Sequence, residues 1–376
     1  MLNEPTFDPG LWEEVASYVQ GLDDGGKPLA TRIHSADEMY LYDLSMAYQS
    51  RETAAIFYFS AGQLIFRTVA EIVRWRFGSF DAVRSFLDFA SGYGRSTRFL
   101  VRALAPERLS VAEVDPEAVR FQEETFGVRG IVSGPEPEAL QLDRPYDVIL
   151  ACSFFSHLPA ARFEAWLQRL QTALTPGGIL IFSTHGMELL EPEADRSTSG
   201  IVFRPVSETN RLDSADYGTS YVTSEFVRST TDRATGGEGR LLTFPFGLGG
   251  FQDLYVLLRP PLPPVLDLRL ARFPRGSPDD SAIGDGVVSV EGWAVGDTDE
   301  RPPDVRLFLR DTVAGFSPGE GMCGSRRRWS FSFPVSAVSP DDVVRVEAES
   351  ERGLSKILVI GTLRPYLENP PESQSP

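Results

Sequence analysis

A short hydrophobic strand followed by a turn of small residues is the part of this sequence that is best suited to chemistry. The predicted strand is Ser85–Phe89 with Asp88 inside it, and Gly92 and Gly94 mark the turn before the next helix. Glycines at such a turn let backbone N–H groups and the helix N-terminus come close to a bound ligand. A tight turn without any ligand has the same pattern, so this fragment alone leaves both interpretations open.

A second acidic residue strengthens the ligand interpretation. Asp115 follows the next predicted strand, Leu109–Val114, and lies about twenty residues past the glycines, as in nucleotide-binding folds. A carboxylate at that place can accept hydrogen bonds from both hydroxyls of a ribose. Pro116 comes directly after it, so Asp115 also suits the N-cap position of a helix. The two roles are compatible, and we expect Asp115 to bind the ribose of a nucleoside cofactor.

The elements that must position these residues alternate between strands and helices over residues 85–183. Short apolar runs such as Tyr146–Ala151 are separated by helical patterns, of which Arg162–Leu174 is the clearest. Alternation at this spacing is typical of βαβ units and a parallel sheet. The sequence therefore predicts an α/β fold with a doubly wound, Rossmann-like sheet.

The chain changes character after a predicted hairpin of Arg240–Phe246 and Asp253–Leu258. The next segment, 260–265, is rich in proline, which favours a stiff linker and cannot continue a central strand. Beyond it the helical period disappears, and runs of alternating polarity predict a small β-sandwich. The predicted strands are Asp267–Phe273, Val287–Ala294, Val305–Arg310, Trp329–Val335, Val343–Ala348 and Ile357–Leu363.

The charge balance restricts the partners. The chain has 36 Lys and Arg against 53 Asp and Glu, a net charge of −17. A negative field of this size repels phosphate backbones and anionic membrane surfaces, so we expect neither nucleic acid nor membrane as a partner. Cys152 and Cys323 are too far apart for zinc-type spacing, and no metal is expected. Without a signal-peptide pattern or an uninterrupted membrane-length apolar run, a cytoplasmic location is expected.

Several segments together resemble one family. The first motif of the class I S-adenosylmethionine-dependent methyltransferases is similar to acid-x-Gly-x-Gly-x-Gly, and this chain has Asp88, Ala90, Gly92 and Gly94 at those positions. Arg144–Cys152 looks like the family's fourth strand, and Leu174–Phe182 resembles its motif before and within the fifth strand. The resemblance covers roughly residues 80–260, with Ala90 in place of the first glycine.

The resemblance implies S-adenosyl-L-methionine as the cofactor and gives roles to particular residues. Asp88 would orient the turn or the methionine amino group, and Asp115 would hold the ribose. Ser133 and Gly134 would border the adenine. Further implied cofactor contacts are Ala90, Ser91, Gly92 and Gly94 along the methionine and ribose, Cys152, Ser153 and Phe154 facing the sulfonium, and Tyr58 and Gly62 closing over the cofactor from the N-terminal helices.

Two histidines are the candidate catalytic residues. Methyl transfer to a hydroxyl requires removal of a proton, and neutral imidazole suits that task. His157 and His185 each follow the C-terminal end of a predicted strand, which is the edge where ligands collect in open parallel sheets. We rank His157 first because the fourth strand's end faces the methyl group in similar enzymes. A hydrogen-bonding role at a helix start for His157, and a loop-organising role for His185, remain as alternatives.

The sequence thus predicts a methyltransferase that acts on a small-molecule or glycan-like acceptor, with O-methylation as the first choice. It does not determine the oligomeric state. One alternative is a catalytically inactive protein of the same fold whose β-sandwich binds a partner or a glycan. A nicotinamide-dependent oxidoreductase is disfavoured by Thr97, where a dinucleotide motif has Gly or Ala. The predicted domains are a helical lid region (1–79), the methyltransferase domain (80–259), the linker (260–265), the β-sandwich domain (266–365) and a disordered tail (366–376).

Overall fold

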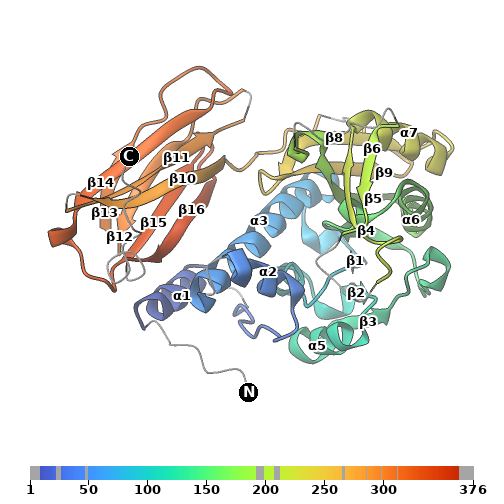
Figure 1. Cartoon of the computed structure of the whole chain (residues 1–376). Coiled ribbons are helices and arrows are strands. Elements are labelled where there is room, and N and C mark those ends of the chain that lie inside the picture. The colour runs from blue at the N-terminus through green and yellow to red at the C-terminus, as the bar shows by residue number, and fades with distance from the viewer. Residues whose placement is uncertain are drawn as a thin grey trace. The chain divides into compact units, whose positions relative to one another are not determined.

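The contacts of the chain divide it into two units (Figure 1). The computed structural model describes residues 9–22, 27–46, 50–191, 199–206, 212–264, 267–284, 286–297, 299–310 and 312–363. The larger unit consists of Gly25–Tyr42 and Ala61–Leu270, and the smaller unit of Met1–Asp24, Asp43–Ser60 and Ala271–Pro376. The predicted tail, 366–376, lies outside the described residues. The predicted lid region, 1–79, is divided between the two units.

The larger unit is built on a mainly parallel sheet, which confirms the predicted fold class. Its parallel strands lie in the order β3 (Arg129–Val132), β2 (Leu109–Glu113), β1 (Phe86–Phe89), β4 (Tyr146–Ala151) and β5 (Leu174–Gly186). The predicted hairpin is confirmed as β8 (Arg240–Leu248) and β9 (Gln252–Leu258), and β9 pairs antiparallel with β5. A short ribbon of β6 (Ile201–Arg204) and β7 (Thr219–Val222) pairs with the C-terminal end of β5.

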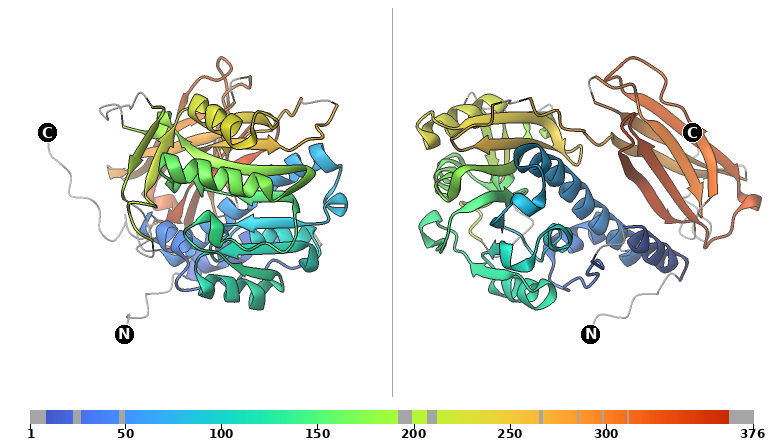
Figure 2. Two further views of the ribbon diagram at one scale, coloured as in Figure 1. Left: turned by 90° about the vertical axis from the view of Figure 1, so that its right-hand side faces the viewer. Right: turned by 180° about the vertical axis from the view of Figure 1, so that it is seen from behind.

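Helices cover both faces of this sheet because its strands are apolar on both sides. On β4, Val148 belongs to one core cluster and Ile149 to the other. The first cluster packs against part of α3 (Arg51–Phe77), α4 (Thr97–Ala103) and α5 (Pro116–Phe126). The second packs against α6 (Ala160–Thr172) and α7 (Ser224–Thr235), which Figure 2 shows in its left view. The predicted apolar stripe of α6, with Trp166 and Leu170, is buried.

The helix α3 is long and apolar enough to cross a membrane, with a mean hydropathy of 1.3 in its most apolar window. However, 61% of that window is buried inside the protein. Val69, Ile72 and Val73 are completely buried and join the core beside the sheet. This burial identifies α3 as a core helix, because a lipid-facing helix would present such residues outward.

The smaller unit contains the predicted β-sandwich. One sheet has the order β10 (Arg275–Gly284), β11 (Val287–Val295) and β14 (Arg327–Pro334), and the other β13 (Thr312–Ser317), β12 (Asp304–Leu309), β15 (Val343–Glu349) and β16 (Ser355–Thr362). The prediction of a strand at Asp267–Phe273 is wrong, since the first strand begins at Arg275. Leu270 and Phe273 are buried, but their segment pairs with no strand. Apolar residues buried in this way gave the alternation of polar and apolar residues that suggested a strand. The prediction also missed β13, most of which is exposed and carries no apolar stripe.

The N-terminal helix α1 (Pro9–Gly21) is part of the smaller unit. Glu14 on this helix forms an ion pair with Arg345 of β15, and both side chains are largely buried. Arg345 also lies over the ring of Phe308, 4.7 Å from its centroid. Helix α2 (Glu38–Met46) begins in the larger unit, where Asp37 caps it by accepting hydrogen bonds from the Met39 and Tyr40 N–H groups.

Candidate cofactor and acceptor site

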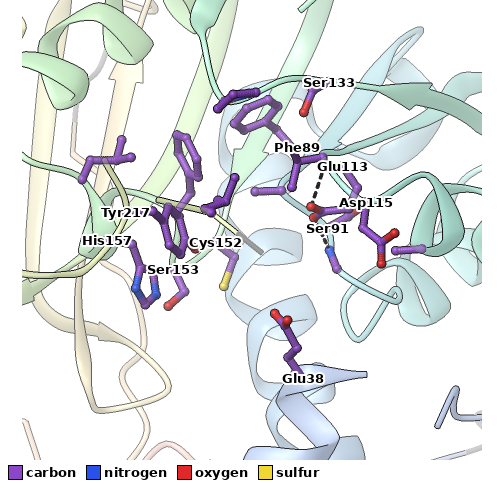
Figure 3. A pocket seen from close by; sticks show the side chains of 18 of the residues that line it. Glu38, Phe89, Ser91, Glu113, Asp115, Ser133, Cys152, Ser153, His157 and Tyr217 are labelled. Atoms are coloured by element: carbon purple, nitrogen blue, oxygen red, sulfur yellow. Dashed lines mark hydrogen bonds between the residues drawn. The ribbon is translucent and has the colours of Figure 1, made fainter. Parts of the chain in front are cut away.

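A cavity of about 380 Å³ lies in the larger unit at the C-terminal ends of β1, β2 and β4 (Figure 3). The strand order reverses between β1 and β4, and ligands bind at such a switch point in open α/β sheets. The volume is within the range of about 300–1,000 Å³ that is usual for small-molecule sites. Of the predicted site residues, those that line it are Asp88, Ala90, Ser91, Gly92, Asp115, Ser133, Gly134, Cys152, Ser153, Phe154 and His157.

The turn after β1 depends on left-handed backbone. Ala90, Gly92 and Gly94 have φ angles of 53°, 55° and 83°. A Cβ atom on Gly94 would lie 2.4 Å from the Phe126 ring of α5, whereas one on Gly92 would meet no atom within 4 Å. Gly92 therefore leaves open space beside the cavity that it lines, and Gly94, which does not line it, permits the close packing of α5.

The acid at the end of β2 is Glu113, which the sequence interpretation missed. The Glu113 carboxylate accepts hydrogen bonds from the backbone N–H of Gly92 (2.9 Å) and of Val114 (2.7 Å). Asp115 caps α5 by accepting from the Glu117 N–H, and it also accepts from the Tyr93 hydroxyl (2.9 Å). Both acids line the cavity, as Figure 3 shows. The sequence interpretation extended this strand to Val114, whereas β2 ends at Glu113. An acid at the last position of the strand was the signal that could have identified Glu113.

Asp88 lies beneath the turn and is almost completely buried. Burial raises the pKa of its carboxyl to about 7; a hydrogen bond from Thr97 to the ionised carboxylate opposes this increase, and the nearby Glu113 adds to it. The hydroxyl of Thr97 is 2.8 Å from the Asp88 carboxyl. Thr97 thus occupies the position that a dinucleotide motif gives to a glycine, and its side chain contacts the first acid of the motif.

The loop after β4 forms the floor beside the turn. Burial raises the pKa of the Cys152 thiol to about 11, so the sulfur stays protonated and is a weak nucleophile. Ser153 has a positive φ of 59°. Its backbone N–H donates to the Ser183 hydroxyl (2.8 Å), and its own hydroxyl accepts from the Gln252 amide (2.8 Å). The loop is therefore held by β5 and β9 in a conformation that a free chain rarely adopts.

His157 lies on the wall of the cavity opposite the turn (Figure 3). Its Nδ1 atom is 2.8 Å from the carbonyl oxygen of Gly218. A carbonyl can only accept, so Nδ1 carries a proton, and in the neutral imidazole Nε2 is then the nitrogen with the lone pair. The ring is stacked on Tyr217, with centroids 4.8 Å apart and an interplanar angle of 13°.

His185 does not line the cavity. Its ring centroid is 6.2 Å from that of His157, and its Nε2 accepts a hydrogen bond from the Gln252 amide (3.2 Å). Burial lowers the pKa of His185 to about 4, and the neighbouring His157 adds to this decrease. His185 is therefore neutral at pH 7 and is connected to Ser153 through Gln252.

Two other predicted contacts also fall outside the lining of the cavity. Tyr58 is completely buried in the smaller unit. Gly62 of α3 packs against α4, where a Cβ atom would lie 2.5 Å from the Arg95 carbonyl oxygen and 2.6 Å from the Phe99 ring. On that side the cavity is bordered instead by the start of α2, with Asp37, Glu38 and Met39.

Arg162 connects two segments that line the cavity, and the sequence did not indicate this. Arg162 at the start of α6 forms ion pairs with Glu136 and with Asp216. The hydrogen bonds that Arg162 donates to these two carboxylates, the one to Glu136 first, raise the pKa of Arg162. The bridge connects the loop after β3, which contains Ser133, to the segment that contains Tyr217. Both segments line the cavity, so Arg162 joins two of its walls.

Comparisons with known proteins agree with this geometry. A family model described as "Methyltransferase domain" matches residues 87–180. The ribosomal protein L11 methyltransferase of Agrobacterium fabrum is 25% identical over an alignment of 179 residues, and the match covers 45% of this chain and 58% of that protein. The chain therefore spans little more than half the length of this relative.

Two solved structures are also similar. An S-adenosylmethionine-dependent methyltransferase from Clostridium acetobutylicum has 12% identity and a TM-score of 0.41, covering 58% of this chain and 96% of that one. DesVI from Streptomyces venezuelae has 15% identity and a TM-score of 0.42, covering 61% and 99%. Residues 87–180 thus match a methyltransferase domain, and the strand order and the position of the cavity at the switch point agree with that match.

Proposed function

We propose that this protein transfers a methyl group from S-adenosylmethionine to a hydroxyl of a small-molecule or glycan-like acceptor. The observation that carries the proposal is the contact of His157 Nδ1 with the Gly218 carbonyl, which orients the imidazole. Its Nδ1 is bound to the Gly218 carbonyl, so the basic Nε2 belongs to a residue that lines the same cavity as the glycine turn. A neutral imidazole held in this way suits the removal of a proton from a hydroxyl.

The residues of the turn and of β2 fit the cofactor. Gly92 leaves space that a side chain would fill, and Glu113 presents a carboxylate at the strand end where a ribose binds in such folds. We assign ribose binding to Glu113, with Asp115 beside it. Ser133 and Gly134 line the far side and would border the adenine. When bound, S-adenosylmethionine supplies a methyl group that its sulfonium has already activated.

The residues of this chain would do three things for the transfer. The aromatic cluster of Phe89, Phe154 and Trp166 excludes water from one wall of the cavity. The stack of Tyr217 on His157 keeps the imidazole in one orientation. His157 would then accept the hydroxyl proton at Nε2 as the methyl arrives, which is the general-base role.

An amine acceptor is the second candidate, and one observation favours it. Among the described residues, eight acidic side chains but only two arginines, Arg95 and Arg162, line the cavity, so its field attracts a cation. The eight are Asp37, Glu38, Asp88, Glu113, Asp115, Glu136, Asp213 and Asp216. An amine must also lose a proton before it attacks, so His157 would serve either acceptor.

Calorimetry with S-adenosylmethionine, S-adenosylhomocysteine and NAD side by side tests the cofactor. We expect the first two to bind and NAD not to bind. Transfer of labelled methyl from S-adenosylmethionine to matched pairs of sugars, one with a hydroxyl and one with an amine at the same carbon, then tests the acceptor. Labelling of the amino sugars alone would reject O-methylation. Binding without transfer to any acceptor would favour the alternative of an inactive binding protein, and failure of both adenosyl ligands to bind would reject the proposal.

We place the activity in the cytoplasm. Cys152 and Cys323 are both free thiols, and cytosolic reductants keep cysteines in that state. Fractionation of cells that express the protein tests this placement. Recovery with a membrane or secreted fraction would contradict it.

A further inference from the structure

Three buried side chains form a chain of hydrogen bonds beneath the cofactor turn. The Thr97 hydroxyl of α4 lies 2.8 Å from the Asp88 carboxyl of β1 and 2.8 Å from the Oε1 atom of Gln122 on α5. The Nε2 atom of Gln122 is 2.8 Å from the Ser91 hydroxyl and 2.8 Å from the Gly92 carbonyl oxygen. Asp88, Thr97 and Gln122 are each at most 1% exposed, so water does not complete these bonds.

The orientation of the Gln122 amide follows from its contact with the turn. A backbone carbonyl can only accept a hydrogen bond, so the nitrogen of the amide must face Gly92. The oxygen of the amide then faces Thr97 and is itself an acceptor. The Thr97 hydroxyl thus lies between two oxygens, one from Gln122 and one from Asp88.

If Asp88 were ionised, these contacts would lack one of the protons that they need. Two short contacts between three oxygens need two protons, and the Thr97 hydroxyl has only one. Gln122 has no proton on its oxygen. The second proton must therefore be on the Asp88 carboxyl, which donates to Thr97 while Thr97 donates to Gln122.

We infer that Asp88 is a neutral carboxylic acid in the cofactor-free protein, that Thr97 and Gln122 are positioning residues which connect its protonation to the Ser91–Gly92 turn, and that binding of S-adenosylmethionine releases this proton. The inference rests on the proposed cofactor. The net charge of S-adenosylmethionine is positive at neutral pH, since a sulfonium and an ammonium face one carboxylate. Asp88 lines the cavity that receives it, and a positive charge nearby favours the ionised carboxylate.

The charged groups around Asp88 act in the same direction before the cofactor enters. Glu113 of β2 faces it and disfavours a second negative charge, and burial does so more strongly, raising the pKa of Asp88 to about 7. Cys152 at the end of β4 is protonated because burial raises its pKa to about 11. Arg95 acts on Cys152 from the turn and is the positively charged group on this side of the cavity.

Ionisation of Asp88 would change the turn. Thr97 would then donate to the carboxylate, and its contact with the Gln122 oxygen would bring two acceptors together without a proton. The Gln122 amide would have to move, and it holds Ser91 and Gly92. Cofactor binding and the conformation of the turn are coupled in this way.

The first experiment uses the cofactor-free protein. Infrared difference spectra of the wild type between pH 5.5 and pH 8.5 should contain the carbonyl band of a buried carboxylic acid that titrates near pH 7. The band should be absent from Asp88→Asn, whose amide nitrogen can donate to Thr97 in place of the acid. Absence of such a band from the wild type would overturn the inference without any variant. If Asp88→Asn does not fold, Thr97→Val should still shift the midpoint of the wild-type band.

The second experiment measures protons taken up or released on binding. Calorimetry at pH 6.5 in buffers of different ionisation enthalpy should show release of up to about one proton with S-adenosylmethionine. Asp88→Asn should bind with no such release, and S-adenosylhomocysteine, which lacks the sulfonium charge, should release less. Binding by the wild type without proton release would overturn the inference, whereas no binding at all would instead reject the cofactor.

Discussion

The cavity has a cofactor half, around the turn after β1 and the end of β2, and a second half around His157, where we propose that the acceptor binds. The residues of these two halves are brought together over different distances along the chain. In the cofactor half, the hydrogen bond between Gly92 and Glu113 joins residues 21 positions apart. In the acceptor half, the bond between Arg162 and Asp216 spans 54 positions, and the bond between His157 and Gly218 spans 61. The first half is therefore local enough to be a sequence motif, whereas the second depends on how separate segments fold together.

The halves also differ in whether backbone groups or side chains form the site. The cofactor half uses backbone geometry, with Ala90 and Gly92 in the left-handed region and the Gly92 N–H bound to a carboxylate. The acceptor half uses side chains, namely an imidazole, a tyrosine ring and a bridging guanidinium. We expect substitutions in the first half to alter folding and cofactor affinity, and substitutions in the second half to alter turnover.

The largest effect is expected at Gly94. Gly94→Ala should lower the free energy of unfolding by about 3 kcal/mol, because the new Cβ both clashes with Phe126 and prefers another backbone conformation. Gly92→Ala is the matched control, since its Cβ meets no atom within 4 Å. It should retain most of its stability and lose affinity for S-adenosylhomocysteine. Denaturant unfolding and calorimetry measure both, and equal stability of the two variants would contradict the steric argument.

Removal of His157 tests the acceptor half. His157→Ala should lower the turnover rate about a hundredfold or more with little change in cofactor affinity, as expected for loss of a general base. His185→Ala should lower turnover much less, because His185 does not line the cavity. Rates are compared with cofactor titrations and thermal melts of both variants. Near-normal turnover in His157→Ala would remove the general base from the proposal.

The two acids after β2 separate cofactor binding from helix capping. Glu113→Ala should weaken S-adenosylhomocysteine binding by about 1–3 kcal/mol, since it leaves polar groups unpaired. Asp115→Ala should mainly lower the free energy of unfolding, by about 1 kcal/mol for the lost helix cap. Calorimetry and denaturant unfolding on both variants decide between the roles. A greater loss of affinity in Asp115→Ala would return ribose binding to that residue.

The smallest effect is a pH dependence of stability from His185. Its pKa of about 4 in the folded protein lies below the ordinary value of 6.5. The unfolded chain therefore takes up a proton first as the pH falls, and folding stability decreases from pH 6.5 toward pH 4. His185→Gln should flatten this part of the profile of Tm against pH. Parallel profiles for the wild type and the variant would show that His185 contributes nothing to it.

Most of the fold could be predicted from the sequence. Of the site, only the part that is formed by residues close together in the chain could be predicted. The parallel sheet, the stripe of α6 and the hairpin of β8 and β9 all follow from periodicity, because burial on a sheet repeats along the chain. The strand predicted at Asp267–Phe273 failed because Leu270 and Phe273 are buried without any strand partner. The end of β2 was placed one residue too late, at Val114, and Glu113, to which we assign the ribose in our proposal, was therefore not considered.

The amino-acid sequence by itself determined the class of fold and the turn that a cofactor requires. Both are indicated by patterns within short segments, namely the periodicity of apolar residues and the small residues of one turn, so residue type and spacing are sufficient to predict them. Only the tertiary structure decided that His157 lines the cavity while His185 lies behind it, and that Arg162 joins two walls. These facts depend on the packing of β7 and its flanking segment against β5 and against the segment after β4. No local pattern records that packing, because the free energy that stabilises it comes from surfaces buried between distant segments.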